Sequence, residues 1–131
     1  MSKLWAILAV LLFGAAPQQE TSRTPAAQAK LDQLIAGRVA GEPVRCVKTE
    51  KTRSPIGIDD RTMLFRDGPR LWRNDLEAGY RCSELGMNKS LFTLNKNYQL
   101  CRGNNVYTVD MKDGSTTGSC VLGNFVLYTK P

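Results

Sequence analysis

The order of apolar and polar residues divides this chain into three parts. An unbroken apolar run extends from Leu4 to Phe13, a helix-like pattern follows it, and short apolar segments separated by turn residues occupy the chain from Pro43 onward. The first run is too short to span a bilayer, which takes about 20 apolar residues. Each of the three parts therefore predicts a different kind of structure.

The middle part predicts one short amphipathic helix. Thr24 is a suitable N-cap, and Pro25 suits the first helical position because its ring presets the helical backbone angle. The apolar residues of this segment recur on one face at helical spacing: Leu31, Leu34, Ile35 and Val39. We expect Gly37 or Gly41 to end the helix. Its apolar face is expected to cover its own domain rather than to dock on a partner.

The last part predicts a mainly β fold, either a small antiparallel sheet or a partly closed barrel. A first strand begins at Val44, and the further expected strands are Asp60–Arg66, Arg70–Leu76, Ser90–Leu94, Asn105–Met111 and Asn124–Tyr128. Ser54-Pro55 and the polar stretch Lys112–Ser119 are expected to form turns.

The segment Ile58–Leu76 mixes arginines and aspartates with large apolar residues, and a β-hairpin accounts for it. We expect a two-residue turn at Asp67-Gly68, which sets Leu64 opposite Leu71. A three-residue turn is disfavoured because it places two arginines opposite each other. Either turn buries the same apolar side chains: Leu64, Phe65, Leu71 and Trp72.

The four cysteines are widely spaced and the chain contains no histidine. Structural zinc sites usually bring their ligands in close pairs, so this spacing favours two disulfides over a metal site. The cysteines are Cys46, Cys82, Cys101 and Cys120. Three pairings are open, of which we favour Cys82–Cys101 with Cys46–Cys120. Each bridge is expected to contribute about 3–4 kcal/mol of stability, and no cofactor is implied.

The start of the chain has the three parts of a secretory signal peptide. Lys3 precedes the apolar run, and small residues follow it at Gly14, Ala15 and Ala16. We therefore expect a signal peptide at residues 1–16, a linker and short helix at 17–42, and a disulfide-stapled β domain at 43–131. The protein is expected to be periplasmic or secreted, with no membrane span after cleavage. Removing Lys3 lowers the net charge from +6 to about +5.

No catalytic residues can be assigned from the sequence. Without histidine, the usual Ser-His-Asp and Cys-His arrangements are excluded. A basic surface is the stronger candidate, formed by Arg45, Lys48, Lys51, Arg53, Arg61, Arg66, Arg70, Trp72 and Arg73. Such a surface suits an anionic polymer of the cell envelope, with Trp72 stacking on it. Acidic and basic residues are interspersed, which disfavours nucleic acid, and an envelope protein is an alternative partner.

Two other function classes remain open. A hydrolase would need carboxylates with separated pKa values at the open end of the hairpin, where Asp59, Asp60, Asp75 and Glu77 are expected. A protein-inhibitor module would instead insert an exposed loop into its partner, and Cys82–Lys89 and Lys112–Ser119 are the candidate loops. We favour a non-catalytic binding or interaction module over both.

Several short motifs resemble a family of small, exported, four-cysteine proteins of unknown function from sphingomonad-type proteobacteria. The motifs are Gly37-Arg38-x-Ala40-Gly41, Cys46-Val47, Asp60-Arg61-Thr62, Trp72-Arg73-Asn74, Leu100-Cys101 and Gly123-x-Phe125. The resemblance covers the chain from about Leu31 to its C-terminus. It implies export and a four-cysteine framework, but it names no activity and transfers no catalytic residue. Where the family often has Cys-Pro-Gly-Leu, this chain has Cys82-Ser83-Glu84-Leu85.

Overall fold

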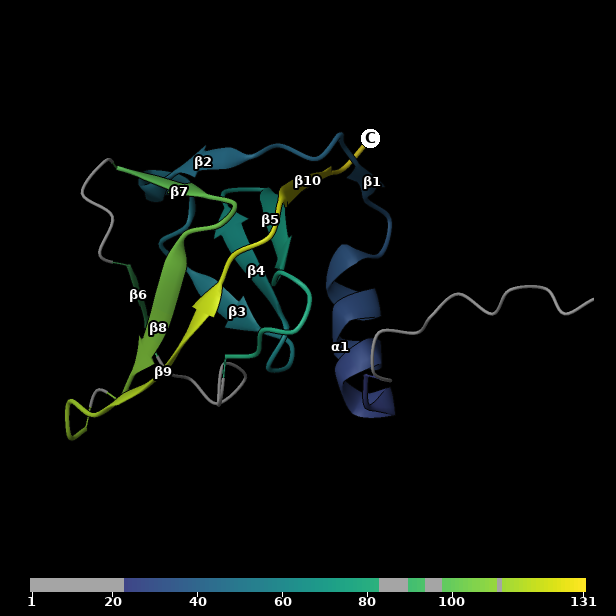
Figure 1. Ribbon diagram of the computed structural model, residues 1–131. Coiled ribbons are helices and arrows are strands. Elements are labelled where there is room, and N and C mark those ends of the chain that lie inside the picture. The colour runs from purple at the N-terminus through teal and green to yellow at the C-terminus, as the bar shows by residue number, and fades with distance from the viewer. Residues whose placement is uncertain (1–22, 83–89, 94–97, 111) are drawn as a thin grey trace, which may run out of the picture.

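The computed structural model describes residues 23–82, 90–93, 98–110 and 112–131. The expected signal peptide and the first residues of the linker lie outside the described residues. The described part is mainly antiparallel β structure with an N-terminal α-helix, which confirms the predicted fold class (Figure 1). The strands form open sheets rather than a closed barrel.

The strands form sheets of five, two and three strands. The largest has the order β1 (Val39–Ala40), β10 (Phe125–Thr129), β5 (Arg70–Asp75), β4 (Thr62–Asp67) and β3 (Pro55–Gly57). The two-stranded sheet pairs β2 (Cys46–Lys48) with β7 (Gln99–Cys101), and the 3-10 helix η1 (Thr49–Lys51) follows β2. The three-stranded sheet has the order β6 (Ser90–Thr93), β8 (Asn105–Val109) and β9 (Thr116–Val121).

The predicted helix is present as α1 (Pro25–Ile35). Its first turn is capped by Thr24, whose hydroxyl accepts a hydrogen bond of 3.2 Å from the backbone N–H of Ala27. The helix ends at Ile35, and Gly37 then takes a left-handed conformation with φ of 70°. The prediction was wrong for Val39, which lies in β1 and is 57% exposed, because the chain has already turned away. No helix in the described residues is long and apolar enough to cross a membrane.

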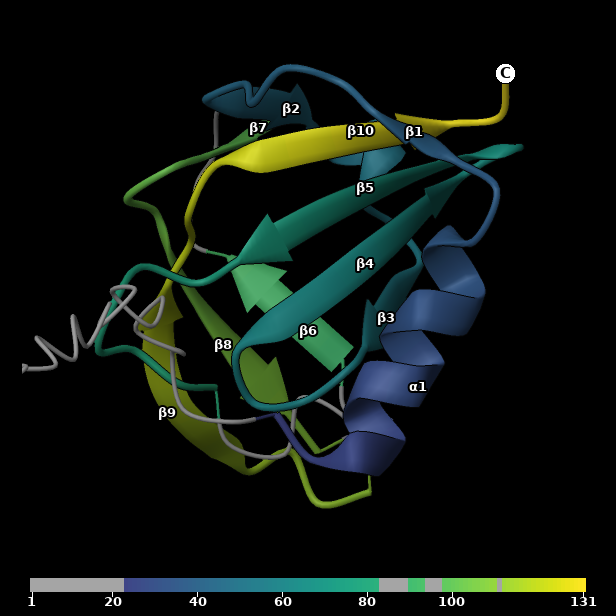
Figure 2. The same ribbon diagram turned by 90° about the vertical axis from the view of Figure 1, so that its right-hand side faces the viewer.

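Helix α1 covers one face of the five-stranded sheet (Figure 2). Leu31 of the helix packs with Ile58, Leu64 and Leu71 in a buried cluster. Two hydrogen bonds join the helix and the segment after it to the sheet: Lys30 Nζ donates to the Gly57 carbonyl at 2.8 Å and Arg38 Nη1 donates to the Pro69 carbonyl at 2.6 Å. The apolar face of the helix therefore covers its own domain, as predicted.

The opposite face of the five-stranded sheet packs against the other two sheets, which lie on the far side from α1 in Figure 1. The buried residues of this main core are Val47, Met63, Phe65, Trp72, Cys82, Leu100, Val106, Cys120, Leu122 and Phe125. The core thus draws on strands from all three sheets, and it fixes their relative positions.

The hairpin of β4 and β5 has its two-residue turn at Gly68-Pro69, so the predicted turn at Asp67-Gly68 was wrong. Proline has no N–H to donate and is better placed in the turn than in the ladder. Asp67 instead pairs with Arg70, and Leu64 lies opposite Arg73 rather than Leu71. The shift changes the partners but keeps every side chain on its predicted face. Leu64, Phe65, Leu71 and Trp72 are all buried, as predicted.

Several strands differ from the sequence-based expectation. Ser54-Pro55 was expected to form a turn, but Pro55 begins the edge strand β3, where a missing N–H is tolerated. Lys112–Ser119 was expected to be entirely a turn, but β9 begins within it, at Thr116. Strands β1 and β7 were not predicted. They are only two and three residues long, and each is defined by pairing with a distant strand, β1 with β10 and β7 with β2.

The disulfides are Cys46–Cys101 and Cys82–Cys120, so two bridges are confirmed but the favoured pairing was wrong. Cys46 and Cys101 lie opposite each other in the β2–β7 ladder, and both are half-buried. Cys82 and Cys120 are fully buried in the main core. The first bridge follows from the register of β2 with β7, and the second from the packing of the segment after β5 against β9. The spacing of the cysteines alone determines neither.

The sheets meet at a corner between β9 and β10, and Gly123 lies at its centre. Asn74 of β5 is fully buried and accepts a 3.0 Å hydrogen bond from the Gly123 N–H through Oδ1, while its Nδ2 donates to the Gly123 carbonyl at 2.9 Å. A Cβ atom at position 123 would lie 2.0 Å from the carbonyl oxygen of Asp75. Only glycine therefore allows the backbones of β5 and this corner to approach so closely.

Replacing Gly123 by alanine is expected to be strongly destabilising. The new methyl group meets backbone rather than a flexible side chain, so the corner must move, and we expect a loss of roughly 3 kcal/mol in the free energy of unfolding. Gly114→Ala is the matched control. Gly114 has a φ of 73° but open space around its Cβ position, so only the backbone penalty of about 1 kcal/mol applies. Equal losses for both variants in urea titrations would contradict the close-approach explanation.

Candidate functional site

The four carboxylates considered for catalysis each have a cationic partner. Asp60 pairs with Arg81 at 3.4 Å, and Glu77 pairs with Arg102. The other two, Asp59 and Asp75, come together beside the N-terminus of α1 because Arg23 contacts both of them. The predicted convergence at the open end of the hairpin is therefore present for only part of the set.

The contacts of Asp59 stabilise its charged form. Its carboxylate accepts from Arg23 Nε at 2.8 Å and from the backbone N–H groups of Arg61 and Thr62, both at 2.9 Å. Burial acts to raise the pKa of Asp59, but the hydrogen bond from Arg23 leads the contributions that lower it, and the net pKa is below its ordinary value. A general acid needs the opposite shift to stay protonated near neutral pH.

Asp75 belongs to the same network of charges. It accepts from Thr62 Oγ1 at 2.6 Å and from Arg73 Nε at 2.9 Å. Burial acts to lower the pKa of Arg73, but the attraction of Asp75 and hydrogen bonds to Asp75 and Tyr128 raise it, with a net increase. These paired charges hold the N-terminal segment and β10 against β5. In this arrangement Asp59 and Asp75 serve as the ion-pair partners of arginines.

The basic residues predicted to form a binding surface fall into two groups. Those that are partly or wholly buried are Lys51, Arg61, Arg70, Trp72 and Arg73. Trp72 is only 9% exposed and packs in the main core, so its ring does not form an exposed stacking surface. The exposed residues are Arg45, Lys48, Arg53 and Arg66, and none of these four has an ion pair with a carboxylate in the part of the chain that the structure describes.

Five cations gather where η1, β3 and the β4–β5 turn meet. We call this set the basic corner: Lys48, Lys51, Arg53, Arg66 and Arg70. The backbone N–H of Arg66 donates to the Ser54 carbonyl at 3.2 Å, which brings β4 beside the residue that follows Arg53. Asp67 lies between Arg70, at 2.9 Å, and Lys51, at 3.9 Å. Asp67 and Glu50 are the carboxylates beside these five cations, so the net charge of the basic corner is positive.

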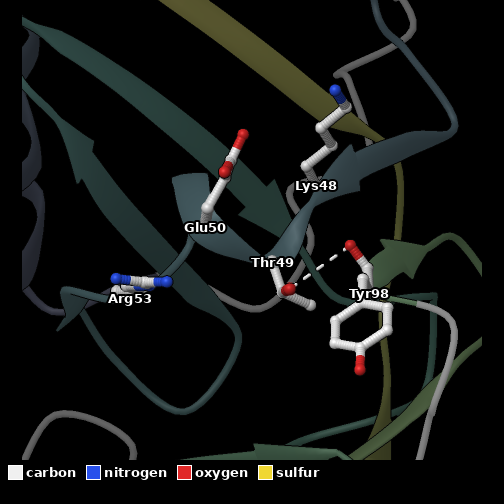
Figure 3. Close-up of a pocket in the computed structure, with 5 residues that line it drawn as sticks. All are labelled: Lys48, Thr49, Glu50, Arg53 and Tyr98. Carbon is white, nitrogen blue, oxygen red and sulfur yellow. Dashed lines mark hydrogen bonds between the residues drawn. The ribbon is translucent and has the colours of Figure 1, made fainter.

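A shallow hollow of about 260 Å³ opens beside this corner, and Figure 3 shows the residues that line it. They are Lys48, Thr49, Glu50, Arg53 and Tyr98. In this view the Lys48 and Glu50 side chains extend to one side of the segment and the Tyr98 ring to the other, so the groups spread over a surface rather than converge on a point. The hollow suits a ligand that lies across the surface.

Thr49, Glu50 and Tyr98 line the hollow but were not among the sequence-based candidates, and Tyr98 is the most unusual of the three. Its side chain is 82% exposed, and its backbone φ of 55° is in the left-handed region. Its carbonyl accepts hydrogen bonds from the Thr49 N–H at 2.9 Å and the Thr49 hydroxyl at 3.2 Å. In the sequence, Tyr98 stands in a polar stretch with no turn signal of its own, so nothing distinguishes it from a strand tyrosine.

Metal-ligating side chains do not gather in the described residues, where no three of Cys, Asp or Glu lie close enough to hold an ion. The inhibitor loop Cys82–Lys89 lies outside the described residues beyond Cys82. The other candidate loop contains an exposed turn from Lys112 to Ser115, stabilised by Asp110 and Asp113.

No family model, curated protein or solved structure matches this chain. The candidate site therefore rests on the geometry of its own residues. The family resemblance of the motifs stays a prediction.

The contacts of Asp59 with Arg23, Arg61 and Thr62 make the stability of the protein depend on pH. The pKa of Asp59 is lower in the folded protein than in the unfolded chain. The charged Asp59 carboxylate therefore stabilises the fold fully above a pH of about 4. This contribution is lost as the pH falls through the pKa that Asp59 has in the folded protein. Urea unfolding at neutral and acidic pH should show this loss. Asp59→Asn should be less stable than the parent at neutral pH and should lose less on acidification.

A Lys112→Gln variant, which removes one exposed charge elsewhere, should keep the parent's dependence on pH. An Asp59→Asn protein that loses as much stability in acid as the parent does would show that Asp59 is not a source of the effect.

Proposed function

We propose that this protein is exported to the periplasm or secreted, and that it belongs to the small four-cysteine family that its motifs resemble. The charged, apolar and small-residue parts of its first 16 residues support export. The two disulfides support it independently, because such bonds persist in oxidising compartments and are rare in reducing ones.

We further propose that the exported domain is a non-catalytic binding module for an anionic component of the cell envelope. The observation that carries this proposal is the basic corner, where Lys48, Arg53 and Arg66 are exposed and lack a carboxylate partner among the described residues. Unpaired cations at a surface hollow attract polyanions over a distance of about one Debye length, roughly 10 Å at moderate salt. This binding requires no shifted pKa.

A carboxylate-based hydrolase is less well supported, because Asp59 and Asp75 are held as charged partners of arginines. A protein-inhibitor module has only the exposed Lys112 turn in its favour, and that turn carries no feature that points to a partner. The basic corner combines unpaired charge, exposure and a hollow, so it supports polyanion binding best.

The binding proposal predicts a strong dependence on salt and on the basic corner. Binding of inorganic polyphosphate and of oligogalacturonate, measured by calorimetry, should weaken about tenfold or more between roughly 50 mM and 300 mM salt. The double variant Lys48→Gln/Arg53→Gln should weaken both by a similar factor at the lower salt concentration. The matched double variant Lys112→Gln/Lys130→Gln has the same net charge but changes two exposed residues away from the corner.

The control variant should bind nearly as the parent does. If both double variants lose affinity equally, the net charge and not the basic corner determines binding. If the parent binds neither polyanion at low salt, the proposed function is wrong.

Export and oxidation can be read from one intact-mass measurement on protein recovered from the envelope fraction of its host. We expect a mass that lacks the N-terminal signal peptide and rises by about four hydrogens on reduction, because reduction adds one hydrogen to each cysteine of the Cys46–Cys101 and Cys82–Cys120 bridges. A full-length chain with free thiols in that fraction would contradict both export and oxidation.

A further inference from the structure

Tyr98 has a combination of properties that core packing does not explain. Among the described residues it is the most exposed large hydrophobic side chain, at 82%. A single exposed tyrosine is ordinary on a protein surface. This one also has a φ of 55°, the only positive φ recorded for a non-glycine residue in the described part of the chain.

The backbone conformation of Tyr98 is unfavourable for an aromatic residue. In the left-handed region the Cβ atom crowds the backbone, so glycine and asparagine are preferred there. Tyr98 is held in place by two hydrogen bonds from Thr49 and by the pairing of Lys48 with Gln99 in the adjoining β2–β7 ladder. Residues kept in such conformations cluster at functional sites. A ring that is 82% exposed on such a backbone points to a binding role for the ring.

The surroundings of the ring indicate what it binds. Lys48 and Arg53 supply cations for acidic groups, while the Thr49 hydroxyl and the Glu50 carboxylate supply hydrogen-bonding groups suited to hydroxyls. An aromatic face offers a flat apolar surface with a negative centre, which attracts the polarised C–H groups of a sugar ring. From the proposed function we infer that the anionic ligand is an acidic polysaccharide that lies across this surface, with one sugar ring stacked on Tyr98 and the acid groups of neighbouring sugars on Lys48 and Arg53.

Two other polyanions fit these residues less well. A membrane surface binds through a wide apolar face bordered by cations, whereas the hollow offers one aromatic ring beside polar Thr49 and acidic Glu50. The other exposed large hydrophobics, Val39, Val44 and Tyr80, belong to other segments. A single-stranded nucleic acid is bound by several aromatic rings along a basic groove, and among the described residues one ring lines the hollow. A polysaccharide needs only one stacking position, with hydroxyls available to the polar neighbours.

The test compares two probes that share negative charge but differ in sugar rings. Oligogalacturonate carries a carboxylate on every ring, and inorganic polyphosphate carries charge without rings. Tyr98→Asn removes the aromatic ring and places a residue that suits the left-handed backbone, so the variant should melt at a temperature no lower than the parent does. We expect it to bind oligogalacturonate about tenfold more weakly, by analogy with the loss of other ring-stacking contacts, and to bind polyphosphate within about twofold of the parent.

Tyr98→Phe is the matched variant that keeps the ring, and it should retain most of the affinity for oligogalacturonate. If Tyr98→Asn binds both probes as the parent does, or weakens both equally, the stacking inference is overturned while polyanion binding stands. If the parent binds neither probe, the proposed function fails as well. Tyr98-dependent binding that is tighter to a DNA single strand or to phosphatidylglycerol vesicles than to oligogalacturonate would also overturn the inference.

Discussion

The close approach of Gly123 to β5 is the constraint on which the arrangement of the sheets depends. At this corner the chain leaves β9 in the three-stranded sheet and enters β10 in the five-stranded sheet. Asn74 satisfies both backbone groups of Gly123 inside the core, where an unpaired polar group costs about 1–3 kcal/mol. The flanking Leu122 and Phe125 are fully buried and fill the space between the sheets. A side chain at position 123 would therefore disturb packing and hydrogen bonding together.

The two disulfides stabilise different parts of the fold, one in the main core and the other in the β2–β7 ladder. Cys82–Cys120 lies inside the main core, where it joins the segment after β5 to β9. Cys46–Cys101 lies at the other end of the β2–β7 ladder from Lys48, so it fixes the register of the ribbon that presents Lys48 and the neighbouring Tyr98. The basic corner is then completed by η1 and the β4–β5 turn. The candidate site is thus held by a covalent bond and a ladder rather than by burial.

The sequence predicts those features that local chemistry determines. The helix followed from its cap and apolar spacing, and the faces of the hairpin followed from alternation, which a two-residue shift of register leaves unchanged. The turn itself was placed one residue early because the restriction that Pro69 imposes on the ladder was given too little weight. The disulfide pairing and β9 depend on which distant strands lie side by side, and Tyr98 on the conformation of one residue. These properties depend on contacts between distant segments or on a single backbone conformation, and no local pattern in the sequence specifies them.

The position of the candidate site on a narrow ribbon has a consequence for how the protein can evolve. The main core tolerates few changes, because its residues come from every sheet and meet at a glycine that cannot be replaced without movement. Lys48, Arg53 and Tyr98 contribute little to that core, and surface substitutions usually change stability by less than about 0.5 kcal/mol. Substitutions at these residues should therefore leave the fold intact, provided that the cysteines and Gly123 are kept. The residues that hold the fold together are thus separate from those of the candidate site, and the two sets can change independently.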